Sequence, residues 1–329
     1  MNRLWRGCVL SILCGVLPVC PVSAFEPGIS GMAKIDDNIF LTVADTKNSH
    51  KSDGRLVANP APRVRILTVG EDDITSEVLT LKYQSSPEDL PPSDLEAACS
   101  LPGQNQGILM AESGFFQGKY GRIFYVRIEN DRNGWTGEVH STFLPFSLKH
   151  QFYSTPKDEQ IEGLACLETP NHDLFLVLAL RGGSHKPGML IWGKLGGLES
   201  NQPVFTKAGE VSLTEGVRFF GNRDASDVFL QKHCEEEWQV WTIAVDDPGG
   251  KFGPFQSVIY SPGTFSWDES HGLLFHPTRP LVGWKREGLK VEALAGPAKQ
   301  VENSVLSIGT EEEALGGMWF PLFPDENNP

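Results

Sequence analysis

Long apolar runs are scarce in this sequence. Beyond residue 24, no segment has enough consecutive apolar residues to cross a bilayer, so no membrane span is predicted. Positive charge is also scarce, because 28 Lys and Arg stand against 42 Asp and Glu and give a formal net charge of −14. Nucleic-acid partners need a basic surface to meet the phosphate backbone, so we expect none. The acidity suits solubility, or cation binding where carboxylates converge.

Several catalytic motifs are missing as well. The sequence has no HExxH zinc motif, zinc-type cysteine pairs, Walker loop, GxSxG elbow or dinucleotide-binding glycine motif. The enzyme classes that these motifs mark are therefore not predicted.

The first 24 residues have the features of a signal peptide. Arg3 and Arg6 precede a short apolar run from Val9 to Val19, and Val22-Ser23-Ala24 follows. We predict cleavage after Ala24 and a secreted or periplasmic protein. A lipid anchor at Cys20 is the alternative, although the preceding valine fits such sites poorly.

Cysteines are few after the leader. Only Cys99, Cys166 and Cys234 remain, and an odd number in an exported protein leaves at least one thiol unpaired. Cys99 and Cys166 fall at similar places in two neighbouring repeats. They either form a disulfide or are small buried apolar side chains, and we favour the second interpretation.

Helical periodicity is nearly absent, whereas Gly and Pro interrupt the chain at short intervals, which favours an all-β fold. A unit of short strands recurs, with copies beginning near residues 30, 96, 162, 215, 271 and 316. Spacings of about 45 to 66 residues suit four-stranded sheets, and a ring of such sheets buries a continuous core. We predict a single six-bladed β-propeller over residues 25–320, with five blades as the alternative, and a disordered tail at 321–329. Pairing of the chain ends would complete the sixth sheet.

Three carboxylates recur at corresponding places in these copies, namely Glu96, Glu162 and Glu215. The first strand of each blade lines the central channel, so we expect the three to converge near its mouth. Their repulsion would be offset by a bound cation, by arginines or by protonation. Ca²⁺ is the expected cation because it accepts oxygen ligands in flexible geometry. Alternatively, each carboxylate accepts backbone N–H bonds at its blade corner, with no metal.

Two arginines and one histidine are candidates for catalysis. Arg181 follows the second strand of the third copy, and Arg218 lies three residues after Glu215. If both reach the channel, they could clamp a phosphate or carboxylate group, or form salt bridges with the glutamates. His271 stands where the other copies have a carboxylate, so it could act as a general base or a metal ligand.

Short patches across most of the chain after the leader resemble a known family. Ile161-Glu162-Gly163-Leu164-Ala165 with Leu178-Ala179-Leu180-Arg181-Gly182-Gly183 resembles the signature of an uncharacterised bacterial domain family related to the phytase-like and esterase-like propellers. Gly216-Val217-Arg218 and Ser93-Asp94-Leu95-Glu96 resemble its neighbouring motifs. The resemblance implies an exported propeller that acts on phosphate esters with Ca²⁺, with these site residues: Glu96, Glu162, Arg181 and Arg218.

The chain departs from that pattern at two positions. Ala97 stands where the family motif has Gly, and His271 stands where Glu is expected. Both departures affect the completeness of the predicted metal ring.

Three functions follow from these features. The first is a Ca²⁺-dependent phosphoester hydrolase with its site at the central channel and a small anionic substrate. The second is a non-catalytic propeller that binds a ligand or a protein partner through its loops. The third is a metal-dependent, lactonase-like hydrolase.

Overall fold

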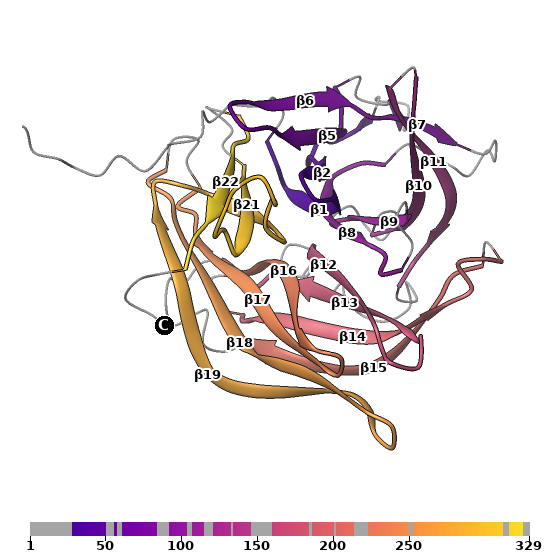
Figure 1. The fold of residues 1–329 in the computed structure, drawn as a ribbon, viewed down its shortest axis with the longest axis vertical. Helices are drawn as coiled ribbons and strands as arrows, with labels where there is room; N and C mark the ends of the chain where they lie inside the picture. The colour runs from indigo at the N-terminus through magenta and orange to yellow at the C-terminus, as the bar shows by residue number, and fades with distance from the viewer. Residues whose placement is uncertain are drawn as a thin grey trace, which may run out of the picture.

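The fold is a ring of β-sheets around a central channel (Figure 1). The computed structural model describes residues 28–50, 56–57, 61–83, 92–103, 107–114, 121–132, 134–145, 160–183, 186–200, 202–213, 223–249, 253–311 and 316–324. The predicted leader, its cleavage site after Ala24 and the last five residues of the predicted tail lie outside these ranges. Strand β22 runs to Leu322 and so includes the first two residues of that tail.

The strands form five blades, each numbered from the channel outward. The first blade contains β1 (Gly31–Asp36), β2 (Ile39–Val43), β5 (Val64–Val69) and β6 (Ile74–Val78). The second contains β8 (Leu95–Ser100), β9 (Gly107–Glu112), β10 (Ile123–Asp131), β11 (Gly134–Phe143) and β7 (Thr80–Tyr83). The third contains β12 (Ile161–Glu168), β13 (Leu174–Leu180), β14 (Gly188–Gly196) and β15 (Val204–Leu213).

The last two blades differ in size. The fourth contains β16 (Arg223–Cys234), β17 (Glu237–Asp246), β18 (Gln256–Asp268) and β19 (Gly272–Glu287). The fifth contains only β20 (Val291–Ala295), β21 (Leu306–Thr310) and β22 (Trp319–Leu322). A separate hairpin pairs β3 (Ser49–His50) with β4 (Leu56–Val57).

The prediction of an all-β propeller is confirmed, but the favoured count of six blades is wrong. The inner strands β1, β8, β12, β16 and β20 contact one another in that order, and β20 contacts β1, which closes the ring at five. The ends of the chain do not form a sixth sheet among the described strands. The N-terminal segment instead joins the fifth blade, where the Ile29 N–H donates to the Thr310 carbonyl at 2.9 Å.

The last two predicted copies were misplaced along the chain, and the first strand predicted for the fourth copy lies almost wholly outside the described residues. The segments predicted as first and second strands of a fifth copy, around His271 and Trp284, both belong to the outermost hairpin of the fourth blade. Pro277 and Pro280 signal a turn, yet they lie inside β19. They are tolerated there because β19 is the outer strand and bulges away from β18 between Ser261 and Gly263. The predicted start of a sixth copy is the outer strand of the fifth blade.

One strand crosses between blades. The predicted strand from Glu77 to Tyr83 is divided at Leu79 into β6, which completes the first blade, and β7, which pairs in parallel with β11 of the second. This crossing ties the outer edges of two blades together.

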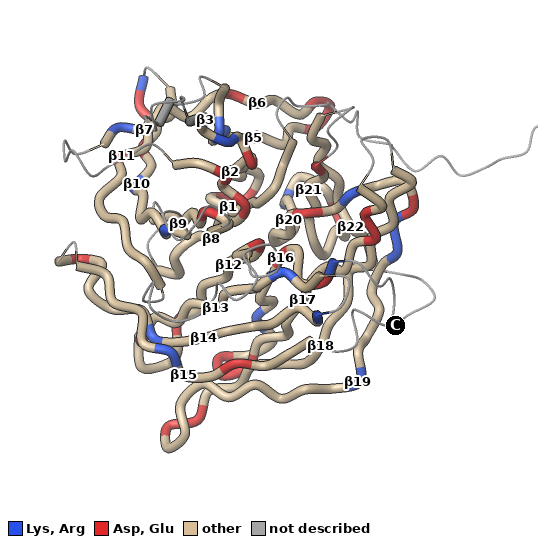
Figure 2. The backbone as a smooth tube through the Cα atoms, turned by 180° about the vertical axis from the view of Figure 1, so that it is seen from behind, with Lys and Arg blue, Asp and Glu red and all other residues tan. Residues whose placement is uncertain are grey.

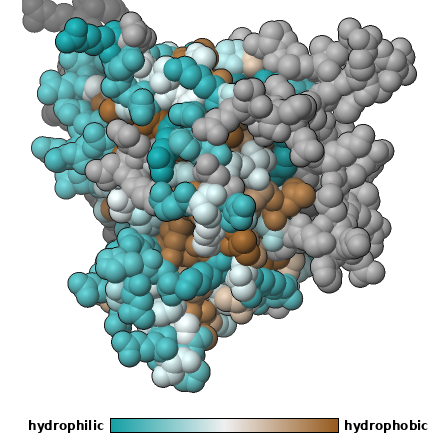
Figure 3. All heavy atoms as spheres, turned by 90° about the vertical axis from the view of Figure 1, so that its right-hand side faces the viewer, coloured by the Kyte–Doolittle hydropathy of each residue, from teal (hydrophilic) through white to brown (hydrophobic). Residues whose placement is uncertain are grey.

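The core lies between neighbouring blades. Six buried apolar clusters occur in the described chain. Five of them combine residues of two adjacent sheets, and the sixth lies within the fourth blade. At the closure, Phe40 of the first blade packs against Trp319 of the fifth with ring centroids 6.0 Å apart. The surface is more polar, and on the face in Figure 3 hydrophobic side chains gather in a small central area among hydrophilic ones. The sheets therefore bury their apolar faces against each other, as the repeat pattern predicts.

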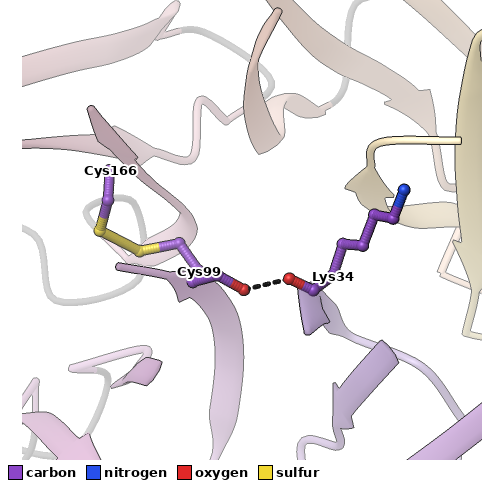
Figure 4. The surroundings of a disulfide bond; sticks show 4 residues. Lys34, Cys99 and Cys166 are labelled. Atoms are coloured by element: carbon purple, nitrogen blue, oxygen red, sulfur yellow. Dashed lines mark hydrogen bonds between the residues drawn. A yellow bond between two sulfur atoms is a disulfide. The ribbon is translucent and has the colours of Figure 1, made fainter. Parts of the chain in front are cut away.

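A disulfide joins two inner strands. Cys99 of β8 and Cys166 of β12 are bonded, with their Cα atoms 6.2 Å apart (Figure 4). The favoured interpretation of these cysteines as unbonded apolar residues is therefore wrong. Cys234 is a free, exposed thiol. Disulfides are typical of oxidising compartments outside the cytoplasm. In the described ranges, no helix is long and apolar enough to span a membrane.

Candidate functional site

The site lies where the inner strands begin, at one end of the channel. Glu96, Glu162 and Glu292 each sit at a β-bulge, because the register of the inner strand shifts at that residue. A β-bulge changes the direction of a side chain, so that it departs from the regular alternation between the two faces of the sheet. Figure 2 shows charged residues gathered around the starts of the inner strands. We call this end the mouth, and it comprises Asp45, Lys47, Asp94, Glu96, Glu162, Arg181, Arg223, Asp247, Lys290, Glu292 and Glu311.

Small residues let the inner strands approach closely here. A Cβ atom on Gly163 would lie 2.6 Å from the Val228 nitrogen, and one on Gly31 would lie 2.6 Å from the Cα of Ala97. At these two positions any side chain larger than hydrogen would force the inner strands apart. Ala97, where the family motif has glycine, is itself fully buried beside Gly31.

The structure brings together only part of the predicted site. Glu96 and Glu162 lie at equivalent bulges in adjacent blades, and Arg181 Nη1 lies 3.0 Å from Glu162 Oε1. Glu215 and Arg218 lie outside the described residues. His271 lies away from the mouth, in the exposed turn between β18 and β19.

Sequence reasoning missed two further carboxylates of the inner strands. Glu292 lies in Val-Glu-Ala-Leu-Ala, which repeats the apolar-Glu-small pattern around Glu96 and Glu162. This pattern could have identified Glu292. The predicted fifth copy began too early in the chain, however, and so residues 288–294 were assigned to a later strand of that copy. Asp227 lies in a wider bulge of β16, between Asp224 and Val228, and has no comparable motif.

The equivalent carboxylates are compensated in three different ways. Asp227 is buried and accepts backbone N–H bonds from Leu294 at 2.5 Å and Val228 at 2.7 Å. Glu162 pairs with an arginine. In the described part of the chain Glu96 has neither kind of partner, and burial, followed by the charges of Glu162 and Asp94, raises its pKa well above the usual range. This environment therefore favours the neutral, protonated form of Glu96.

Glu96 also belongs to an acidic triad with Asp45 and Asp94. One carboxylate oxygen from each lies within 4.8 Å of the others, so the triad could bind a metal ion. Lys47 Nζ now lies between two of them, 3.0 Å from Asp94 and 3.2 Å from Asp45. Burial and then the charge of Glu311 raise the pKa of Asp45 to about 6. The triad thus holds more negative charge than one lysine neutralises, and its hard oxygen donors fit a cation such as Ca²⁺ once Lys47 moves away.

The opposite side of the mouth is a charged network. Lys290 Nζ lies 2.5 Å from Glu311 and 3.0 Å from Glu292, and Arg223 contacts Glu292 and Asp247 at 3.2 Å. Burial alone would raise the pKa of Glu311, but hydrogen bonding to Glu292 and the ammonium of Lys290 together hold it far below its usual range. Burial, and then the charge of Glu311, raise the pKa of Glu292. These opposite shifts favour the ionised form of Glu311 and the neutral form of Glu292.

Comparisons with known proteins identify the fold alone. No protein-family profile and no curated protein matches the sequence. A solved exo-1,5-alpha-L-arabinanase from a bovine ruminal metagenomic library is similar in structure, with a TM-score of 0.50, 9% identity, and coverage of 92% of this chain and 95% of that one. An exo-beta-1,3-galactanase from Clostridium thermocellum has a TM-score of 0.49 and 10% identity, over 94% of this chain and 64% of that one. The WD40 propeller domain of Doa1 has a TM-score of 0.38 and 9% identity, over 91% and 94%.

Proposed function

We propose that the mouth is the active site of a hydrolase that cleaves glycosidic bonds in a neutral carbohydrate, with Glu96 as general acid and Glu162 as general base. One observation carries the proposal: two glutamates at equivalent bulges of adjacent blades have opposite surroundings. Glu96 is buried, which raises its pKa, and it forms no ion pair with any described residue, whereas Arg181 Nη1 lies 3.0 Å from Glu162 Oε1. Glycoside hydrolysis uses such a pair, one protonated carboxyl group and one carboxylate.

The charge of the mouth favours a neutral substrate. Each of its four described cations, Lys47, Arg181, Arg223 and Lys290, already lies within ion-pair distance of a carboxylate. A phosphate group would have to displace one of these carboxylates or bring a cation with it. The five-bladed fold, which a solved arabinanase shares, is compatible with glycoside hydrolysis but does not decide it, because fold and function are separable.

Leaving-group dependence tests the role of Glu96. The substrates are 4-nitrophenyl glycosides and the matching arabino- and galacto-oligosaccharides, and the variant is Glu96→Gln. An oligosaccharide leaves as a poor alkoxide and needs a proton, so kcat should fall by about 10²- to 10⁴-fold. A nitrophenolate needs little protonation, so kcat on the aryl glycoside should fall far less.

Glu168→Gln is the matched control, because it removes a carboxylate from the far end of β12. It should leave both activities unchanged. Equal losses on the two substrate types in Glu96→Gln, or no turnover of any glycoside by the wild-type protein, would refute the assignment.

A Ca²⁺-dependent phosphoester hydrolase is the second candidate, and the triad of Asp45, Asp94 and Glu96 favours it. In this proposal Ca²⁺ replaces the Lys47 ammonium, and Arg181 holds the phosphoryl group, with Arg218 as a further clamp. Calorimetric titration with Ca²⁺ of the wild-type protein and of Glu96→Gln tests the site. Stoichiometric binding that the variant loses, with chelator-sensitive turnover of a phosphoester, would support this candidate over the first.

Lactone turnover would indicate the lactonase-like alternative. A protein without metal or turnover would be a binding propeller.

We also propose that the protein is exported to the periplasm or the medium. The Cys99–Cys166 disulfide supports this location, because such bonds persist in oxidising compartments. N-terminal sequencing of the protein recovered from cells should begin at Phe25, and an uncleaved cytoplasmic protein would contradict export.

A further inference from the structure

A cavity lies between the outer strands of the third and fourth blades. Its volume is about 570 Å³, within the range of small-molecule sites. It is lined by residues of β15, β18 and β19, chief among them Ser212, Tyr260, Pro262, Phe275 and Arg279. None of these residues belongs to the mouth.

An irregularity of the fourth blade opens this cavity. Ser261 pairs with Leu281 and Gly263 with Pro277, so three residues of β19 lie opposite Pro262 of β18. The three extra residues have no partner in the ladder with β18, and Pro277 and Pro280 cannot donate backbone hydrogen bonds across the gap because they lack an N–H. The cavity is therefore a consequence of backbone geometry and does not depend on one side-chain rotamer.

Rigid aromatic walls preserve its shape. The Phe275 ring packs against Phe265 and Trp192, with centroid distances of 5.2 Å and 6.2 Å. The Tyr260 hydroxyl donates to Asp224 Oδ1 at 2.6 Å, which fixes the ring. Such preorganised walls lower the entropic cost of binding a flat apolar group.

Arg279 is the single charged residue among those that line the cavity. In the part of the chain that the structure describes, its guanidinium makes neither an ion pair nor a hydrogen bond. Ser212 and Thr278 add hydroxyl groups, and no lining residue is acidic. An unpaired arginine beside apolar walls is complementary to an anionic group attached to a flat apolar body.

We infer that this cavity binds a small organic anion, with a carboxylate or sulfonate on Arg279 and an apolar ring against Phe275 and the prolines. The inference does not depend on the function proposed for the mouth. It applies to an outer site that the central chemistry does not use.

Two fluorescent probes of similar shape and different charge test the inference. They are 1-anilinonaphthalene-8-sulfonate, which is anionic, and N-phenyl-1-naphthylamine, which is neutral. The anionic probe should bind the full-length mature protein at one site. Arg279→Gln should weaken the anionic probe at least tenfold and the neutral probe less than twofold. Ser212→Trp should abolish the binding of both, because the indole fills the cavity.

Lys285→Gln is the matched control, since it removes an exposed positive charge from the same strand outside the cavity. It should leave the affinities for both probes unchanged. All variants are compared at equal native content by near-ultraviolet circular dichroism, and both Ser212 and Arg279 are exposed, so folding should be preserved. Anionic-probe binding that is absent in the wild type, occurs at several sites, or is equal in Arg279→Gln would overturn the inference.

Discussion

Replacement of Lys290 by Met should show how strongly the mouth depends on charge pairing. The Lys290 ammonium contacts Glu311 at 2.5 Å, Glu292 at 3.0 Å and Asp247 at 3.9 Å, and only 9% of its side chain is exposed. Methionine keeps the volume of the side chain but removes the ammonium from buried Glu311, while Arg223 still pairs with Glu292 and Asp247. Removing one partner of a buried ion pair costs about 3–5 kcal/mol, so the free energy of unfolding at pH 7 should fall by that amount.

The cost should depend on pH in a defined direction. In the wild type the pKa of Glu311 is lower in the folded state than in the unfolded state, so its ionisation stabilises the fold above the unfolded value and this contribution is lost as the pH falls. Without Lys290 that depression weakens. The loss caused by Lys290→Met should therefore be larger at pH 7 than at pH 4, where the carboxyl group takes up a proton instead.

Urea unfolding at both pH values measures these differences, and Lys194→Met is the control. Lys194 pairs with Asp173 at 2.6 Å, but its side chain is 53% exposed, so the change should cost about 0–1 kcal/mol. Equal losses in the two variants, or a loss in Lys290→Met that does not change between pH 7 and pH 4, would refute the reasoning.

Three further changes test other parts of the fold. Gly163→Ala should lower the free energy of unfolding by about 1–3 kcal/mol, because its Cβ would meet a backbone nitrogen of β16 at 2.6 Å, whereas Gly196→Ala meets nothing within 4 Å and should be tolerated in the same urea assay. Changing both Cys99 and Cys166 to Ser should cost about 4 kcal/mol on the loop-entropy estimate for a separation of 67 residues, and a reductant should then no longer shift the unfolding midpoint. Burial raises the pKa of Asp224 to about 6, so the unfolding free energy of the wild type should decline between pH 4 and pH 7 as this group ionises, and Asp224→Asn should show a smaller decline.

Local patterns made the first three blades predictable. Strands β1, β8 and β12 begin within one residue of the predicted copies, because short alternating segments and turn residues mark them in the sequence. The same signals placed Glu96 and Glu162 at equivalent positions. They failed in the fourth blade, where β18 and β19 are long and a proline-rich stretch lies within a strand.

The sequence by itself determined the all-β class, the repeated sheets and two of the inner carboxylates, since each depends on residues close together along the chain. Only the tertiary structure decided the number of blades, the partner of each carboxylate and the presence of the disulfide. Lys47 meets Asp94, and Arg223 meets Glu292, across dozens of residues of sequence. Burial and neighbouring charges set the pKa of a carboxyl group, and both depend on how the blades close into a ring. Glutamates at equivalent positions therefore differ in their chemistry.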